Sequence, residues 1–223
     1  MRSQIFIDIG SSKTKWKCNE IYSELNTVDF DFDILPSVDK VWISNVSKRL
    51  FEFDEPNFNF IKSQQSYKSL VNSYKEPGFL GSDRWLAMIA AYEYSQENDF
   101  IVIDIGTAVT LDVVNRSGVH QGGLIFPGLY KIRQTFDLFP VTTHRIVNSI
   151  GQSTKDAWSI GTMALLVNSI NFKIEELKKE FPNARIFTSG GGFGEVKEFL
   201  NFSYEYHKNI VLDGLEFYAD IMG

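Results

Sequence analysis

The chain has 223 residues, of which 43% are hydrophobic and 22% charged, and its formal net charge at pH 7 is −6. These values are ordinary for a folded globular protein, and they exclude a disordered, collagen-like or coiled-coil chain. The acidic balance argues against a general nucleic-acid binder, because neutralising phosphates needs a basic surface. The single cysteine, Cys18, excludes an intrachain disulfide and a Cys-x-x-Cys metal site, and it fits a cytoplasmic protein.

No targeting segment and no membrane partner are expected from the sequence. Asp8 interrupts the short apolar run at the amino end. The longest other apolar run, from Leu86 to Tyr92, is far shorter than the roughly 20 residues that a membrane-spanning helix needs.

Two strand-like runs, 5–10 and 101–106, end in the same way, with an aspartate, an isoleucine and then a glycine turn. Small hydroxyl residues follow each turn, and then a second strand with alternating polarity. In the first hairpin this alternation places Lys13, Lys15 and Lys17 on one face. The repetition favours a duplicated domain.

Helices are predicted between and after the hairpins. Ser82 is expected to cap a helix from Asp83 to about Gln96, and an amphipathic segment predicts a long helix from near Thr154 to Phe181. The other predicted elements are a strand over 184–188 and helices over about 195–202 and 211–221. No element is predicted for Asp29–Phe60. Strands that lead into helices in each half predict an α/β fold, with domains 1–99 and 100–223 divided just before Phe100.

Five segments could carry chemistry, and each also has a purely structural interpretation. The hairpin 8–15 combines a carboxylate, a glycine turn, hydroxyls and lysines, which suits a phosphate and Mg²⁺, and 104–112 repeats it. Either could instead be an ordinary hairpin, and we interpret Asp112 as structural. The glycines of 188–192 and 122–128 allow close approach of a ligand or simply form turns. In 81–84 an aspartate precedes an arginine. The aspartate could be a base beside an anion-binding arginine, or it could be a simple helix cap with a surface charge beside it.

In order, the segments DIGSSKTK, GSDR, DIGTAVT, GGLIFPG and SGGG resemble those of type III pantothenate kinases, in the group that contains actin and the acetate and sugar kinases. The resemblance runs from Asp8 to Gly192. It implies an α/β fold of two duplicated ribonuclease H-like (actin-like ATPase) domains with an interdomain cleft. It also implies ATP-dependent phosphorylation of pantothenate to 4'-phosphopantothenate, the first step of coenzyme A biosynthesis. The implied cofactors are ATP with Mg²⁺ and a monovalent cation, K⁺ or NH₄⁺.

The resemblance also assigns roles to residues. Asp83 matches the proton acceptor, Asp104 the ligand of the monovalent cation, and Thr107 a threonine that contacts ATP. Thr154 matches a residue of the pantothenate pocket, which in this family forms at a homodimer interface. The residues that match the first phosphate motif are Asp8, Ile9, Gly10, Ser11, Ser12, Lys13, Thr14 and Lys15, and those that match the pantothenate-binding stretch are Tyr74, Gly81, Ser82, Asp83 and Arg84. Ser189 begins a loop that resembles the adenosine-side loop.

The sequence departs from the family in two respects, and it is compatible with two other functions. Ser11 and Ser12 stand where the family usually has asparagine and threonine, so the contact with ATP can differ. The chain is also shorter than many relatives. The rivals are a non-catalytic regulatory pseudokinase of the same fold and a kinase for another small hydroxy acid.

Overall fold

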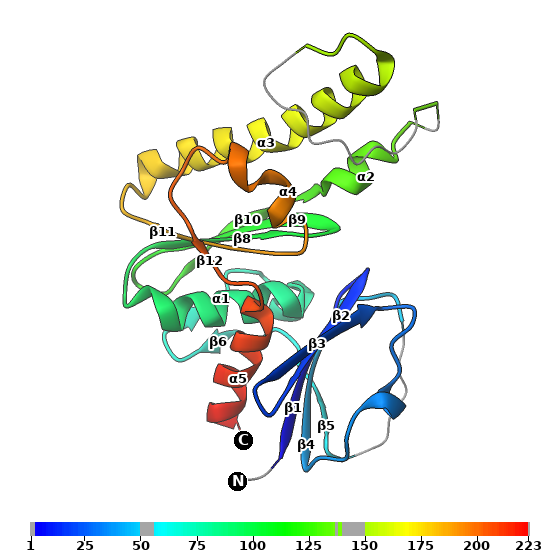
Figure 1. Ribbon diagram of the computed structural model, residues 1–223. Coiled ribbons are helices and arrows are strands. Elements are labelled where there is room, and N and C mark those ends of the chain that lie inside the picture. Colours follow the sequence, from blue (N-terminus) through cyan, green and yellow to red (C-terminus); the bar gives the residue numbers. More distant parts are fainter. Residues whose placement is uncertain (1–2, 50–55, 137, 140–149, 223) are drawn as a thin grey trace. The chain divides into compact units, whose positions relative to one another are not determined.

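The computed structural model describes residues 3–49, 56–136, 138–139 and 150–222 (Figure 1). The chain divides into two compact units, each of which contains a five-stranded sheet. The first unit comprises Met1–Glu97, Arg116–Gly122 and Asn209–Gly223, and the second comprises Asn98–Asn115 and Gly123–Lys208. The expected division at residue 99/100 follows the chain, so it assigns 116–122 and 209–223 differently from these units.

The sheet of the first unit has the strand order β3-β2-β1-β4-β5. β1 forms an antiparallel hairpin with β2 and pairs in parallel with β4. The strands are β1 (Gln4–Ile9), β2 (Lys13–Cys18), β3 (Ile21–Asn26), β4 (Lys40–Asn45) and β5 (Phe58–Phe60). A separate small hairpin, β6 (Ser66–Tyr67) and β7 (Leu70–Val71), belongs to the same unit.

The sheet of the second unit has the order β10-β9-β8-β11-β12, so its strands follow the same topology as those of the first sheet. In each sheet an antiparallel hairpin is followed by a third strand beside it and by parallel strands on its other side. The predicted duplication is therefore confirmed. The strands are β8 (Phe100–Ile105), β9 (Ala108–Val114), β10 (His120–Pro127), β11 (Arg185–Ser189) and β12 (Glu205–Tyr206).

The predicted helices are largely confirmed, with two corrections. Gly81, not Ser82, is the N-cap of the first helix, and Ser82 is its first residue. The helix predicted over 195–202 is wrong in extent, because a short helix and one 3-10 turn end at Phe199. The helices are α1 (Ser82–Ser95), α2 (Leu129–Arg133), α3 (Thr154–Glu180), α4 (Phe193–Val196) and α5 (Ile210–Met222), with 3-10 turns η1 (Phe32–Ile34), η2 (Pro77–Phe79) and η3 (Lys197–Phe199). No described helix combines the length and hydropathy needed to cross a membrane.

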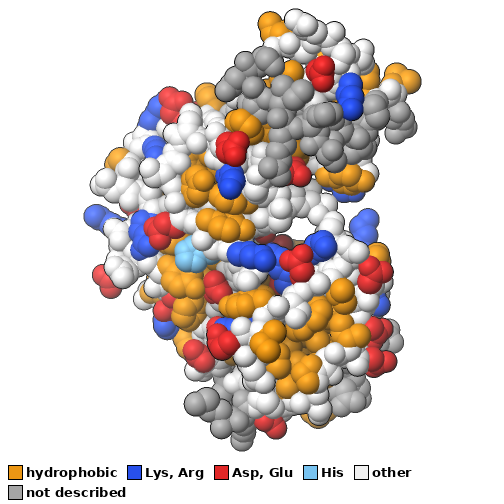
Figure 2. All heavy atoms as spheres, viewed as in Figure 1, with side chains coloured by type: hydrophobic (Ala, Val, Ile, Leu, Met, Phe, Trp, Pro, Cys, Tyr) orange, Lys and Arg blue, Asp and Glu red, His pale blue; other side chains and the backbone are white. Residues whose placement is uncertain are grey.

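One face of the first sheet is covered by aromatic side chains from the loop between β3 and β4. Phe30 and Phe32 are buried against the isoleucines of β1, and their rings pack edge to face at 5.1 Å. The rings of Trp16 and Phe58 continue this aromatic layer. Figure 2 shows hydrophobic side chains gathered on the displayed face of this unit. The segment for which no element was predicted thus completes the core with few regular elements.

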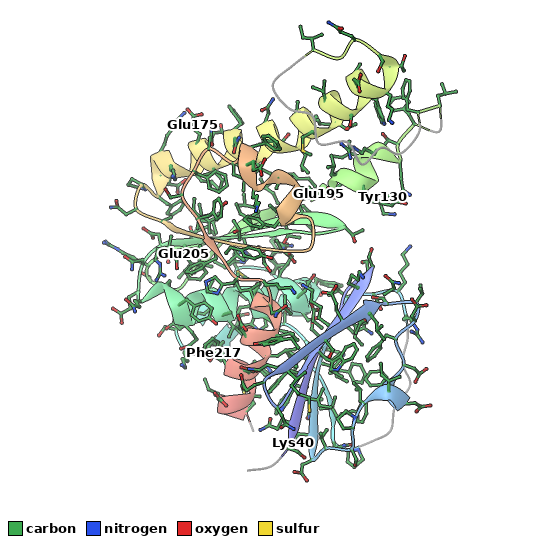
Figure 3. The ribbon with its side chains drawn as sticks, viewed as in Figure 1. Lys40, Tyr130, Glu175, Glu195, Glu205 and Phe217 are labelled. Atoms are coloured by element: carbon green, nitrogen blue, oxygen red, sulfur yellow. The ribbon has the colours of Figure 1, made fainter. Side chains whose placement is uncertain are left out.

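The C-terminal helix α5 packs against α1 and the first sheet. A Cβ atom at Gly214 would overlap the carbonyl oxygen of Leu86, so the two helices cross at a distance that only glycine allows. Phe217, labelled on α5 in Figure 3, packs edge to face on Tyr94 of α1. Because α1 begins at the GSDR segment, α5 helps to fix the position of that segment.

An ion pair joins α5 to the first hairpin. Nζ of Lys17 lies 2.6 Å from Oε1 of Glu216, and the Lys17 side chain is only 8% exposed. Burial alone would lower the pKa of Lys17, but hydrogen bonds to Glu216 and Glu20 raise that pKa above its ordinary value. The alternating pattern of the strand placed Lys17 on the same face as Lys13 and Lys15. It did not reveal that the Lys17 side chain is buried.

We predict that Gly214→Ala destabilises the protein by about 1–3 kcal/mol, because the added methyl group forces α1 and α5 apart. Gly161→Ala in α3 is the matched control, since its Cβ would meet no atom within 4 Å. Alanine there should be neutral or stabilise by about 0.5–1 kcal/mol. Urea unfolding followed by circular dichroism measures both. Equal midpoints for the two variants would contradict the close crossing.

Candidate functional site

The first candidate aspartate lies where two parallel strands of the first sheet end. Asp8 of β1 is in register with Ser44 of β4. The hydroxyl of Ser44 lies 3.0 Å from the hydroxyl of Ser82, the first residue of α1, and both serines are buried. The strand ends therefore link the first hairpin to the GSDR segment within one unit. Ligands of α/β sheets commonly bind beyond this carboxyl edge.

A threonine outside the predicted motif supports the turn of the first hairpin. The N–H of Gly10 donates to the carbonyl of Lys13 at 3.0 Å, which closes the turn. The hydroxyl of Thr27 donates to the carbonyl of Gly10 at 2.7 Å and accepts from the hydroxyl of Thr14 at 3.1 Å. Ser11, Ser12 and Lys13 are exposed at the tip. The hydrogen bonds of Thr27 thus hold the turn in place, and the hydroxyls of Ser11 and Ser12 and the Lys13 side chain are exposed at its tip.

Asp83, Arg84 and Tyr74 form a second group in the same unit. Nη1 of Arg84 donates to the hydroxyl of Tyr74 at 3.0 Å, and the guanidinium lies 5.8 Å from the centre of the Tyr74 ring. The backbone N–H of Arg84 donates to Oδ1 of Asp83 at 2.8 Å. Arg84 is 6% exposed, so a cation is held at a buried position at the start of α1. A buried guanidinium can bind a carboxylate through two hydrogen bonds.

Gly81 and the side chain of Asp83 lie close together. A Cβ atom at Gly81 would lie 2.6 Å from Oδ1 of Asp83, closer than such atoms approach in real structures. The carboxylate of Asp83 is therefore held over the backbone of the preceding turn, with Gly81 and Asp83 each partly exposed. The sequence motif identified both residues, and the structure places them in contact.

Asn72, which the sequence did not single out, organises the loop that carries Tyr74. Its Oδ1 accepts from the N–H of Tyr74 at 3.0 Å, and its Nδ2 donates to the carbonyls of Gln64 and Pro77. Asn72 is 1% exposed. Its amide therefore fastens both sides of the loop, and no local sequence signal distinguishes it from an asparagine in any turn.

His120 is a second residue that the sequence did not single out. It is 1% exposed, and its ring stacks on that of Tyr74 with centroids 5.9 Å apart and planes 15° apart. Its Nδ1 lies 3.3 Å from the hydroxyl of Ser73. The only available signal was a histidine among the glycines 118, 122 and 123, which were interpreted as turns or substrate contacts.

The second unit repeats the strand-end arrangement around Asp104. Asp104 of β8 is in register with Ser189 of β11, as Asp8 is with Ser44. The N–H of Gly106 donates to the carbonyl of Ala108 at 2.9 Å and closes the hairpin turn. A Cβ atom at Gly190 would overlap both Oδ1 of Asp104 and the backbone of β8. The glycine run therefore passes directly over the aspartate.

Thr107 and Thr154 also lie in the second unit, so they belong to a different compact unit from the Tyr74–Arg84 group. Thr107, in the hairpin turn, accepts from the N–H of Gly128 at 3.0 Å through its backbone carbonyl. Thr154 is exposed as the first residue of α3. Ser153 caps this helix by accepting from the N–H of Asp156 at 3.1 Å. The side chain of Thr154 is thus not used as a cap.

The donor set suits hard cations that keep other ligands. Among the described residues no three His, Cys, Asp or Glu side chains gather to form a metal site. Each hairpin instead offers one carboxylate beside hydroxyls and carbonyls, and Mg²⁺ bound with a nucleotide usually takes one or two carboxylates plus phosphates and waters. The residues around Asp8 and Asp104 therefore fit a cation that shares its coordination with phosphate oxygens.

Sequence comparison identifies a family to which this chain is similar. Residues 26–176 match the family model of type III pantothenate kinase. A type III pantothenate kinase from Hahella chejuensis is 36% identical over 165 residues, which cover 71% of this chain and 66% of that protein. One from Marinobacter nauticus is 26% identical over 235 residues, which cover 95% of this chain and 96% of that protein.

Structural comparison supports the fold. A Baf family protein from Campylobacter jejuni, which carries the name of a transcriptional activator, has a TM-score of 0.68 at 24% identity, and the match covers 98% of both chains. The activator of the 2-hydroxyisocaproyl-CoA dehydratase from Clostridium difficile, solved with bound ADPNP, has a TM-score of 0.52 at 11% identity and covers 99% of this chain and 95% of that one. The fold is that of the actin-like ATPases and sugar kinases, as expected.

Proposed function

The chain belongs to the type III pantothenate kinase family, and we infer that it phosphorylates pantothenate with ATP in the first step of coenzyme A biosynthesis. One observation carries this inference most directly. Asp83 and Arg84 share the start of α1, and Arg84 is joined to Tyr74 at 3.0 Å. A base, a buried cation and an aromatic hydroxyl are thus grouped as an acceptor with both a hydroxyl and a carboxylate requires.

In this proposal Asp83 accepts the proton of the attacking pantothenate hydroxyl. The hydroxyl oxygen bonds to the γ-phosphorus of ATP, the bond from that phosphorus to the bridging oxygen breaks, and ADP leaves. Arg84 binds or orients pantothenate, and Tyr74, Gly81 and Ser82 complete the acceptor side. Phosphoryl transfer passes through a loose transition state, so positioning and charge compensation contribute most of the catalysis.

The hairpin turns are the proposed phosphate sites. Asp8, the exposed Ser11 and Ser12, and the lysines Lys13 and Lys15 supply a carboxylate, hydroxyls and positive charge. Thr107 supplies the corresponding hydroxyl in the second unit. Serine hydroxyls replace the asparagine and threonine usual in the family, so the ATP contact here depends on hydroxyl and backbone donors. Mg²⁺, when bound, would neutralise phosphate charge beside these carboxylates.

The two hairpin aspartates have different neighbours, which supports different roles. Asp8 lies directly across its hairpin from Lys15, whereas Asp104 lies across from Thr110. Directly opposed residues of an antiparallel pair lie on the same face, so the cross-strand neighbour of Asp8 is a lysine and that of Asp104 is a threonine. We therefore propose that Asp104 binds the monovalent cation, K⁺ or NH₄⁺.

A homodimer is the proposed working unit, and α3 is its proposed contact. The side chains of Leu165 and Phe172 on α3 are 59% and 63% exposed. A groove of about 650 Å³ runs beside this helix, lined in part by Met163, Val167 and Phe199. Apolar surface on a helix supports a two-fold contact with a second copy. In this arrangement Thr154 would serve the acceptor site of the partner, in a cytoplasmic enzyme.

A screen of phosphate acceptors tests the reaction itself. ATP consumption should rise with pantothenate and remain low with other small hydroxy acids. ATP hydrolysis unaffected by any acceptor would favour the regulatory alternative, and turnover with a different hydroxy acid would change the substrate.

We predict that Asp83→Asn lowers turnover by about 10²–10⁴-fold, because the amide cannot accept the hydroxyl proton. Asp33→Asn, at an exposed aspartate of the same unit, is the matched control and should retain wild-type turnover. Both variants should melt at wild-type temperature. Near-normal turnover of Asp83→Asn would remove this residue from the mechanism.

Activity should require K⁺ or NH₄⁺ in addition to Mg²⁺, because the cation adds positive charge beside the phosphates. Turnover is measured first in buffer with sodium as the only monovalent cation and then with potassium added at constant ionic strength. Equal turnover rates with and without potassium would mean that Asp104 has another role, most simply Mg²⁺ coordination.

Mixing two inactive variants should restore activity if sites are shared. Asp83→Asn and Thr154→Trp chains are each expected to be nearly inactive as homodimers. A mixed dimer carries both lesions in one site and leaves the other intact, so it should recover up to about half of the activity by two-site counting. Confirmed heterodimers without activity, or a fully active monomer in sedimentation, would exclude a shared site.

A further inference from the structure

We propose that His120 is a positioning residue that fixes the Tyr74 ring and, through it, the Arg84 guanidinium that receives the acceptor. This inference rests on the proposed function, because it assigns a further residue to the acceptor side of the same reaction. It depends on contacts within the first unit, to which His120 belongs although it is also the first residue of β10.

The turn that carries His120 is attached to the β6–β7 hairpin. The N–H of Val71 donates to the carbonyl of Gly118 at 2.8 Å, and Val71 forms a parallel bridge with Val119. Gly118 has a φ of +79°, and a Cβ atom there would overlap the carbonyl of Ser69. Only glycine fits both requirements. The turn is therefore held in one place, and it brings the next-but-one residue, His120, to the Tyr74 loop.

His120 contacts two consecutive residues of that loop. Its ring lies nearly parallel to the ring of Tyr74, with planes 15° apart, and its Nδ1 is 3.3 Å from the Ser73 hydroxyl. A 1% exposed imidazole is costly to bury unless its nitrogens are satisfied, so apolar packing alone is a poor explanation for this residue type. The combination of a stacking face and a polar edge limits both sliding and rotation of the loop.

Tyr74 transmits this restraint to Arg84. The Tyr74 hydroxyl accepts from Nη1 of Arg84 at 3.0 Å, and the guanidinium lies 5.8 Å from the same ring. A displaced ring would move the hydroxyl and weaken a hydrogen bond that depends on distance and angle. Because His120 acts through Tyr74, its loss should affect acceptor binding and leave nucleotide binding intact.

The test separates the Michaelis constants of the two substrates. His120→Ala should raise KM for pantothenate about tenfold, a change equivalent to about 1.4 kcal/mol, with KM for ATP unchanged. His120→Phe keeps a ring against Tyr74 and should recover most of this loss. Gly118→Ala displaces the turn without altering the histidine and should show the same selective rise. Calorimetric titration with pantothenate alone should reproduce the order of the variants without turnover.

Phe32→Ala is the control for general destabilisation, because it removes a buried ring from the aromatic layer of the same unit. It should lower the melting temperature and leave KM for pantothenate unchanged. A His120→Ala enzyme that loses kcat alone, changes both KM values equally, or matches Phe32→Ala in every constant would overturn the positioning role. A wild-type enzyme that does not phosphorylate pantothenate would instead overturn the proposed function, and this inference with it.

Discussion

The organisation of both units follows from one constraint, which is that parallel strands end at the same edge of a sheet. The first strand of each unit has an aspartate as its next-to-last residue, and the next parallel strand places a serine in register with it, Ser44 opposite Asp8 and Ser189 opposite Asp104. Beyond this edge the backbone must turn, and glycine turns leave hydroxyls and amides exposed. In the first unit the same edge also fixes the start of α1 through the contact between Ser44 and Ser82. The candidate base and the first candidate phosphate turn are therefore positioned by one sheet.

The group of Tyr74, Asp83 and Arg84 depends instead on loops that buried polar side chains hold in place. Asn72 holds the Tyr74 loop through its amide, and His120 packs on the Tyr74 ring from a distant part of the sequence. Buried amides and imidazoles are stable only when their polar atoms have partners, so each one defines the geometry around it. A site that must distinguish one small hydroxy acid from others benefits from such a support, because an acceptor misplaced by a fraction of an ångström loses the alignment that phosphoryl transfer needs.

The sequence predicted those parts of the structure that leave a local pattern. The two hairpins, α3 and α5 each show a periodicity or a turn signal, and they are found close to the expected positions. Features that depend on contacts distant in sequence were not predicted. Lys17 looks like any strand lysine until Glu216 is placed beside it, and Ser82 looks like a helix cap until Ser44 takes its hydroxyl. The aromatic layer of Phe30 and Phe32 lacks regular periodicity because it fills a face between short loops.

The two hairpins share one backbone arrangement but differ in the charge of the residue opposite the aspartate. Both turns close with a glycine N–H, and both aspartates face a serine on a parallel neighbour. The difference lies across the hairpin, where the position opposite the aspartate is Lys15 in one unit and Thr110 in the other. The two aspartates therefore have different cross-strand neighbours, and this difference is the basis for proposing a monovalent cation at Asp104 rather than at Asp8. Binding a polyanion with an acidic protein therefore requires no general basic surface. In the proposed function, Lys15 in one hairpin and a cation held by Asp104 in the other would each supply positive charge beside a phosphate turn.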